Sequence, residues 1–364
     1  YNTGVGVDVF AALTSGDNNV AVGFGSMGAL TSGYSNVAVG ANALDTATTG
    51  HSNVAIGTNA LTAVTDGMHN VGVGLNAGDS ITTGDYNTVL GSNALNVCST
   101  GGNNTVLGSH SATSLTDGIG NTITGMVSAI ALTTGDYNST LGYAAGYAIT
   151  TGNQNVCIGA SAGLALTTGS SNIAIGTNAL NTQTTPTGDV AIGHEALKTV
   201  SSAGYNVAVG YQAGKAVTSA IGVVLMGYQA GDAITTGDTN ICIGGFSMDG
   251  GAGKTAYGCT HIGHAGQRTG TSGNFNDSMG IDAFKNPTTG NSNVCLGSGS
   301  GNVITTGSSN SLVGRTAGVA ITTGSLNSCL GIVAGSAITT GAKNVCLGYD
   351  AGTSGSPNHI TTGD

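Results

Sequence analysis

Charged, aromatic and proline residues are scarce in this sequence. Of its 364 residues, 7% are charged and 4% are aromatic, with 3 Pro and no Trp. Soluble globular domains carry about 25% charged residues, so we do not expect ordinary globular domains. The shortage of Pro also excludes collagen, which combines abundant Pro with Gly at every third position, although Gly accounts for 65 residues here.

Basic residues are few as well. The 7 Lys and Arg residues stand against 17 Asp and Glu residues, which gives a net charge of −10. Proteins bind nucleic acid through a basic stripe, so we expect no nucleic-acid partner. No apolar run approaches the roughly 18 residues of a membrane-spanning helix, so we expect no membrane insertion by this segment.

The hydrophobic residues, 39% of the chain, recur in a fixed pattern. The segment Asn-Val-Ala-Ile-Gly at 53–57 has close copies at 36–40 and 172–176, and its closing Gly returns every 17 residues. This anchor Gly stands at positions 6, 23, 40, 57, 74, 91, 108, 125, 142, 159, 176, 193, 210, 227, 244, 263, 280, 297, 314, 331 and 348. The chain begins and ends within the pattern, so we expect it to be a piece of a longer polypeptide.

One interval in the pattern is irregular. Gly244 and Gly263 are 19 residues apart, which implies a two-residue insertion. The sequence therefore predicts a regular repeat array over 1–244, an irregular coil over 245–262, and a continuation of the same array over 263–364.

A unit of 17 residues is too short for a helical-hairpin repeat, which needs 33 or more. It suits two short strands and two turns, with Gly closing each strand. Such a coil cannot bury its apolar face alone, but stacked coils pair each strand with its copy about 4.8 Å away. We therefore predict an all-β fold, a parallel β-solenoid (β-roll) of about 21 stacked 17-residue coils.

Two residue types recur in ways that predict structural ladders along the stack. The amide of a repeated Asn can bond to the next coil or to turn backbone that would otherwise lack a partner. Gly suits positions where φ is positive or where backbones crowd. The predicted ladder residues include Asn36, Asn53, Asn70, Asn87, Asn155, Asn172, Gly40, Gly57 and Gly176.

The first strand of each coil is apolar on both faces. Alternation places Val54 and Ile56 on one face and the central Ala55 on the other. A strand that is apolar on both faces is covered on both, so we expect the central positions to pack against a neighbouring chain. The predicted oligomer face comprises Ala38, Ala55, Cys157, Ala174, Cys242, Cys295 and Cys346.

The units resemble the head repeats of trimeric autotransporter adhesins and, more closely, repeats of phage and viral tail fibres and of large bacterial surface proteins. The stretch at 167–180, Thr-Thr-Gly-Ser-Ser-Asn-Ile-Ala-Ile-Gly-Thr-Asn-Ala-Leu, carries this resemblance. The resemblance implies a parallel homotrimer that projects from a cell or virion surface. It also implies an extracellular location and a host-surface glycan or protein as partner.

The sequence offers little catalytic chemistry. The central Cys residues replace Ala and are expected to be small buried hydrophobes rather than a disulfide framework. Gly253-Lys254-Thr255 resembles the end of a P-loop, but the first Gly of that motif is replaced by Met248. We therefore expect no enzyme activity and no cofactor.

His261 is the one candidate metal ligand. In the segment Cys259-x-His261-x-x-His264 the spacing matches no standard zinc site. In a trimer, however, three copies of His261 would converge near the axis and could hold an ion or water. The alternative is an isolated His that is tolerated beside a loop.

Three functions compete. The leading prediction is a structural and adhesive shaft whose function is reach, rigidity and multivalent contact. The alternative is an ice-binding solenoid that uses a ladder of Thr eight residues past the anchor, including Thr31, Thr48 and Thr65. A polysaccharide-cleaving β-helix is the third, but no repeated pair of carboxylates supports it.

Overall fold

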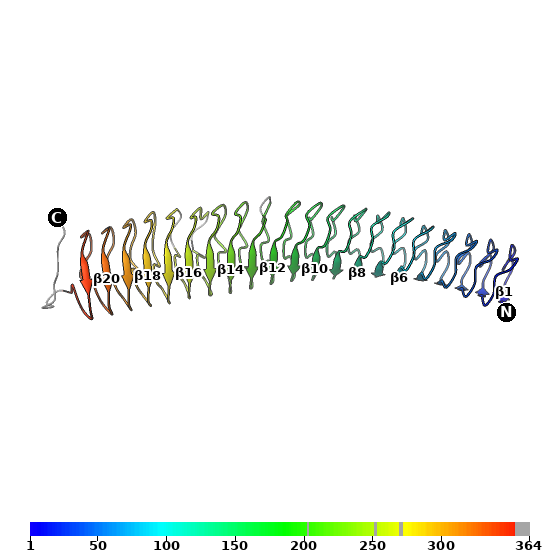
Figure 1. The fold of residues 1–364 in the computed structure, drawn as a ribbon, viewed down its shortest axis with the longest axis horizontal. Helices are drawn as coiled ribbons and strands as arrows, with labels where there is room; N and C mark the ends of the chain where they lie inside the picture. The colour runs from blue at the N-terminus through cyan, green and yellow to red at the C-terminus, as the bar shows by residue number, and fades with distance from the viewer. Residues whose placement is uncertain (202–203, 251–252, 269–271, 354–364) are drawn as a thin grey trace. The chain divides into compact units, whose positions relative to one another are not determined.

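A computed structural model describes residues 1–201, 204–250, 253–268 and 272–353 of the chain. All of the regular secondary structure in these residues is β-strand. The chain divides into two compact units, residues 1–186 and 187–364. In each unit the strands lie side by side as parallel arrows in chain order (Figure 1).

Each coil contributes one three-residue strand. The first unit contains β1 (Thr3–Val5), β2 (Val20–Val22), β3 (Val37–Val39), β4 (Val54–Ile56), β5 (Val71–Val73), β6 (Thr88–Leu90), β7 (Thr105–Leu107), β8 (Thr122–Thr124), β9 (Ser139–Leu141), β10 (Val156–Ile158) and β11 (Ile173–Ile175). The second unit contains β12 (Val190–Ile192), β13 (Val207–Val209), β14 (Val224–Met226), β15 (Ile241–Ile243), β16 (Thr260–Ile262), β17 (Asp277–Met279), β18 (Val294–Leu296), β19 (Ser311–Val313), β20 (Ser328–Leu330) and β21 (Val345–Leu347).

Within each unit every strand pairs in parallel with the next, residue on equivalent residue. Val37 lies opposite Val54, for example, so that the register advances by one 17-residue coil. At the irregular coil Ile241 lies opposite Thr260, so the two extra residues are accommodated outside the strand ladder. The predicted all-β parallel β-solenoid of 17-residue coils is confirmed.

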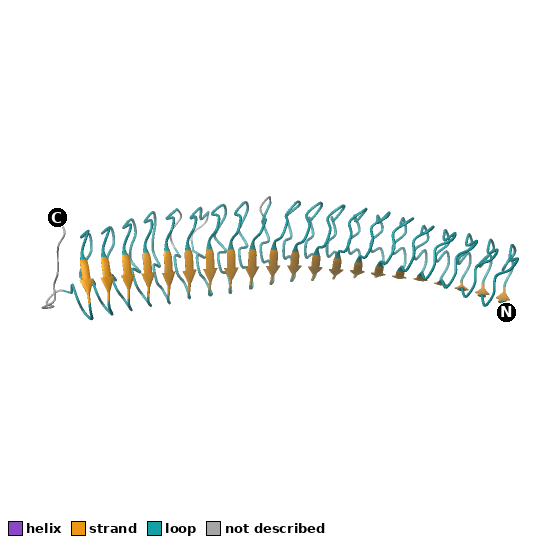
Figure 2. Ribbon diagram, in the orientation of Figure 1, coloured by secondary structure: helices purple, strands orange, loops and turns teal. Residues whose placement is uncertain are grey.

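The predicted second strand of each coil is wrong. That side of the coil is a series of turns, drawn as loops in Figure 2. Asn42 and Leu44 have φ of 56° and 51°, and such left-handed residues at alternate positions cannot form extended strand. The turns still bond to the next coil, because the Leu44 N–H donates to the Ala60 carbonyl at 3.1 Å.

Close contact between coils explains the anchor Gly. Gly40 has φ of 143°, and a Cβ on it would lie 2.4 Å from the carbonyl oxygen of Gly57. Gly176 adopts the same conformation, with φ of 128°. A side chain would strain the backbone at both positions, and at Gly40 it would also collide with the neighbouring coil.

The Asn ladder is buried and bonds as predicted. The Asn36 backbone N–H donates to Asn19 Oδ1 at 3.0 Å, and Asn36 Nδ2 donates to the Gly50 carbonyl at 2.9 Å. Each Asn thus joins one coil to the next and also satisfies a turn carbonyl. The same pattern holds at Asn53, Asn70, Asn87, Asn155 and Asn172.

The core of each coil lies between the strand and the turns. It contains the central strand residue, a small residue three positions after the anchor, and a larger apolar residue further on. In the coil of β4 these are Ala55, Ala60, Leu61 and Val64, all fully buried.

Candidate interaction surfaces

The outward face of each sheet is formed by the first and third residues of the strands. We call these residues the outward sheet face. The central strand residue points into the coil, so its two neighbours point away from it. In β4 this leaves Ala55 fully buried and Ile56 41% exposed.

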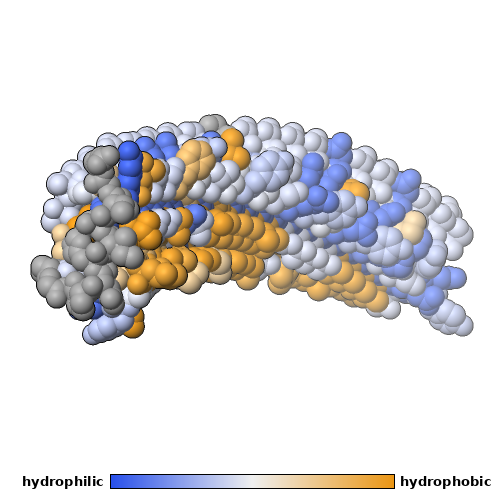
Figure 3. All heavy atoms as spheres, turned by 60° about the vertical axis from the view of Figure 1, so that its left-hand side comes forward, coloured by the Kyte–Doolittle hydropathy of each residue, from blue (hydrophilic) through white to orange (hydrophobic). Residues whose placement is uncertain are grey.

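The outward sheet face is predominantly apolar at its third position. In the first unit the apolar third residues are Val5, Val22, Val39, Ile56, Val73, Leu90, Leu107, Leu141, Ile158 and Ile175. In the second unit they are Ile192, Val209, Met226, Ile243, Ile262, Met279, Leu296, Val313, Leu330 and Leu347. Figure 3 shows hydrophobic residues gathered in a band along the face turned toward the viewer.

The first position of the strands is more varied and gives the face shallow relief. It is Val or Ile in some runs of strands and the smaller Thr or Ser in others, and among the strand residues that the structure describes only Asp277 is charged. A hollow of about 340 Å³ over β19–β21 is lined by residues that include Ser311, Ser328 and Leu347. A second, of about 220 Å³, lies over β8–β10 beside Ser139.

The predicted oligomer face is therefore wrong. Ala38, Ala55, Cys157, Ala174, Cys242, Cys295 and Cys346 are all buried within the single chain. These small side chains fit the narrow space between the strand and the turns of their own coil, where a packed interior selects for volume. Residues that are covered by their own chain cannot form the contact with another.

The sequence did contain a signal for which side of each strand points outward. The flanking positions include Thr88, Ser139 and Asp277, which are side chains that an outward face accepts. The central position is instead mostly Ala, Cys, Val or Leu, as expected of a core. The flanking residues do not stand out in most strands because Val, Ile and Leu make that face apolar as well, so both faces of the strand look buried.

The Thr ladder contributes to coil stacking. Thr31 Oγ1 donates to the Thr48 carbonyl at 2.9 Å, and Thr48 Oγ1 donates to the Thr65 carbonyl at 3.2 Å. These hydroxyl protons are engaged within the chain. The following residue in the described coils, such as Thr49, is exposed.

His261 does not face an oligomer axis. It is the central residue of β16, and its side chain is buried in its own coil with Nδ1 hydrogen-bonded to Ser278 Oγ. Desolvation lowers the pKa of His261 to about 3, so the ring is neutral. The described residues contain no group of three or more His, Cys, Asp or Glu side chains placed to hold a metal ion.

The coils around the insertion hold unusual polar groups in their core. Lys254 is fully buried, and its ammonium donates to the backbone carbonyls of Gln267 and of Arg268, the latter at 3.1 Å. Desolvation lowers the pKa of Lys254 to about 8. Lys254 therefore serves the solenoid core and does not resemble the exposed lysine of a phosphate-binding loop.

The cysteines behave as small core residues. All seven are free and buried. Desolvation raises the pKa of Cys157 to about 12 and the pKa values of Cys98 and Cys259 to about 11, so these thiols are protonated at neutral pH. A protonated, buried thiol is a poor nucleophile and a poor metal ligand.

A ladder of aromatic rings runs along the turns of the second unit. His194, Tyr211 and Tyr228 stack with ring centroids 5.1 and 5.3 Å apart and nearly parallel planes. Tyr228 then meets Phe246 edge-on at 5.1 Å. Because the stacked rings cover each other's faces, this ladder strengthens contact between coils rather than presenting open ring faces to a ligand.

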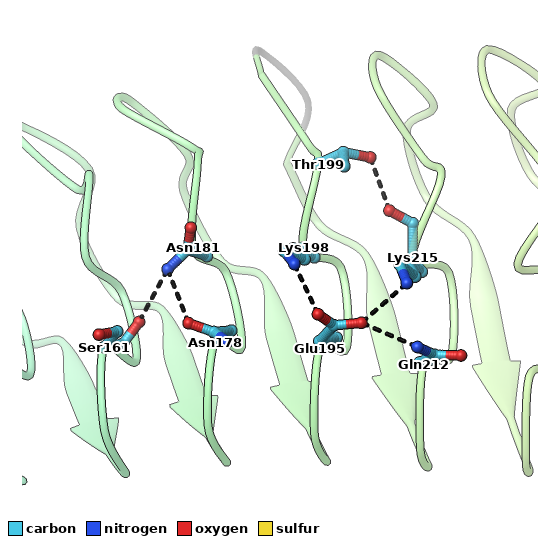
Figure 4. A network of polar contacts seen from close by, with 8 residues as sticks. All are labelled: Ser161, Asn178, Asn181, Glu195, Lys198, Thr199, Gln212 and Lys215. Atoms are coloured by element: carbon cyan, nitrogen blue, oxygen red, sulfur yellow. Dashed lines mark hydrogen bonds and ion pairs between the residues drawn. The ribbon is translucent and has the colours of Figure 1, made fainter.

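A polar ladder joins the same coils at Glu195 and Gln212, which follow His194 and Tyr211 in the chain. Figure 4 shows its contacts. Glu195 accepts bonds from Lys198, from Lys215 at 2.8 Å and from Gln212 at 2.8 Å. Hydrogen bonds from Lys198 and then Lys215 lower the pKa of Glu195 to about 2. The cluster is thus a charge-compensated surface feature and not a carboxylate poised for acid–base chemistry.

Comparison with protein-family models and with curated proteins gives no match for this chain. In the described residues there is no helix that is long and apolar enough to cross a membrane.

Proposed function

We propose that this chain is a structural and adhesive fibre segment, as in a tail-fibre shaft or an adhesin head, and not an enzyme. The observation that supports this proposal is the continuous ladder between coils. Every strand bonds to the next within a unit, and buried Asn side chains repeat the connection between most successive coils. A stack joined in this way resists bending, which suits a protein whose task is to hold a binding partner at a distance from its origin.

The proposal includes assembly into a parallel homotrimer outside the cell, on a cell surface or a virion appendage. Several copies side by side would contact a host glycan or protein at several points, and multivalent contact raises avidity without new chemistry. The resemblance to trimeric adhesin heads and tail-fibre repeats supports the stoichiometry. No cofactor is required.

Light scattering on the purified chain tests this proposal. A mass about three times 35.1 kDa that does not change on dilution is the expected result. A stable mass of 35.1 kDa would contradict it.

Ice binding is the second candidate function. Exposed residues such as Thr49 recur at the same position in successive coils, beside the Thr ladder. This regular spacing favours ice binding, because ice-binding surfaces are regular. The bonds from the Thr31 and Thr48 hydroxyls to the next coil count against it, because those protons are not available to ice. Thermal hysteresis of the purified chain separates the two functions, since a fibre segment produces none.

A further inference from the structure

The outward sheet face is unusual for a surface in contact with water. Leu90 and Leu141 are each 49% exposed, and the third position of the strands is apolar in nearly every coil. Monomeric proteins rarely expose continuous apolar patches larger than a few hundred Å². This face therefore calls for a covering partner.

The size of the face is sufficient for a stable contact. Strands repeat about every 4.8 Å, and the two outward ranks with their side chains span about 10 Å, so the face covers about 500 Å² in each unit. Two such faces amount to about 1,000 Å² on one copy, compared with about 800 Å² that each partner buries in a standard interface.

The period of the face indicates which partner covers it. Its side chains recur at the spacing of the coils, with larger Val, Ile and Leu residues and smaller Ser and Thr residues in one register. A second copy of the same face presents ridges and hollows at that same spacing, and packed sheets fit by such interdigitation. The hollows beside Ser139 and Ser328 are places where a larger side chain of another copy fits.

Charge favours the same partner. The chain carries a net charge of −10, so copies repel one another over most of their surface. On the described strands the outward sheet face holds only Asp277 as a charged residue, so it is the surface on which two copies approach with least repulsion.

We propose that the outward sheet face is the surface by which copies of this chain pack against one another, sheet against sheet. This inference rests on the self-assembly that the proposed function includes. It assigns the contact to the flanking residues of the strands, in place of the buried central residues.

Charged substitutions on the face test the proposal. In Leu90→Lys/Leu141→Lys, both lysines project outward, so the fold should be kept while the contact is lost. The matched control is Leu75→Lys/Leu326→Lys, because Leu75 and Leu326 are 49% and 53% exposed but lie outside the strands. We expect the first variant to fall to a mass of 35.1 kDa and the control to keep the wild-type mass.

Thiol labelling tests the same surface without disrupting it. All seven native cysteines are buried, so a maleimide reacts chiefly with an introduced thiol in the folded protein. In the assembled protein Leu90→Cys should react at least about tenfold more slowly than Leu75→Cys, because only the former is covered.

The outcomes separate the two proposals. If the wild type is a monomer at every concentration, both self-assembly and its assigned surface are wrong. If the wild type is an oligomer but the Leu90→Lys/Leu141→Lys variant keeps its mass and Leu90→Cys reacts as fast as Leu75→Cys, only the assignment of the surface is overturned. Loss of assembly in the face variant alone supports both.

Discussion

The side-chain oxygen of Asn36 accepts a hydrogen bond from the backbone N–H of Asn53, 17 residues later, at 2.9 Å. Neighbouring strands are joined by hydrogen bonds between backbone groups. The Asn side chain adds one more hydrogen bond between coils, at the point where the chain leaves the turn and enters the strand. It is repeated from Asn53 to Asn70 at 2.9 Å. A side chain that satisfies backbone groups in a buried place is hard to replace, which explains why the same residue type recurs.

Replacing one ladder Asn should destabilise the stack strongly. Asn53→Ala leaves the Asn70 N–H and the Gly67 carbonyl without their buried partner. Each unpaired buried group costs about 1–3 kcal/mol, so for the two groups we expect a loss of about 2–6 kcal/mol in the free energy of unfolding, measured with urea. The control is Asn153→Ala, where the Asn accepts an exposed bond from the Asp136 N–H and the expected loss is below about 1 kcal/mol. Equal losses would contradict a special role for the buried ladder.

Contact between coils, and not only backbone conformation, should make the anchor Gly irreplaceable. Gly57 has φ of 133°, and an added Cβ would lie 2.4 Å from the Gly74 carbonyl oxygen. Gly348 has a similar φ of 117°, but an added Cβ meets no described atom within 4 Å. Gly348→Ala should therefore cost about 1–3 kcal/mol from strain alone. Gly57→Ala should cost more than about 3 kcal/mol, because collision adds to the strain.

Thermal unfolding followed by circular dichroism compares the two variants. The anchor-Gly prediction is overturned if Gly348→Ala lowers the melting temperature as much as Gly57→Ala does, because strain would then account for the whole effect.

The 17-residue period was sufficient to predict the fold, because a repeat unit that short has few ways to bury its apolar residues. The Asn and Gly ladders followed from the same logic, since a residue at one position in every coil must meet its own copies. Which side of each strand faces the core could not be predicted in the same way. In a strand such as Val54–Ile56 both faces are apolar, and alternation alone does not say which one is inside.

The turns on the side of the coil opposite the strand could not be predicted from the repeat pattern either. Leu44 and Leu61 recur as a strand residue would, yet both have φ of 51°. An isolated Leu disfavours that conformation. Both side chains are fully buried, so tertiary packing holds the backbone where local preference would not.

The buried thiols should make the protein sensitive to alkali. The pKa of Cys157 is raised from 9.0 to about 12 by desolvation, so between about pH 9 and 12 the folded state keeps a proton that the unfolded state loses. Stability is therefore complete below pH 9 and falls as the pH rises, by about 1.4 kcal/mol per such thiol at pH 10.

Cys157→Ala isolates one thiol in this effect. Ala occupies the equivalent position at Ala174, so the substitution should be tolerated. The difference in urea midpoint between pH 8 and pH 10, measured under reducing conditions, should be smaller in Cys157→Ala than in the wild type. An unchanged difference would show that this thiol does not titrate as its burial implies.

The polar core beside the insertion should be a weak point that a single substitution repairs. Gln267 stands four residues after its anchor Gly, where other coils have Leu44 or Leu61, and it is fully buried. Neither Nε2 nor Oε1 of Gln267 makes a hydrogen bond of regular geometry with a described residue, although the amide lies close enough to His261 to act on the pKa of that ring. Unsatisfied buried groups of this kind cost about 1–3 kcal/mol, so Gln267→Leu should raise the free energy of unfolding by that amount.

The reciprocal change gives the control. Leu61→Gln places the same amide in a regular coil and should lower the free energy of unfolding, because the new polar atoms meet only apolar neighbours. Urea unfolding of both variants measures the two effects. If Gln267→Leu brings no gain while Leu61→Gln is costly, the Gln267 amide must be satisfied by water or another group, and Gln267 would then not be a weak point of the core.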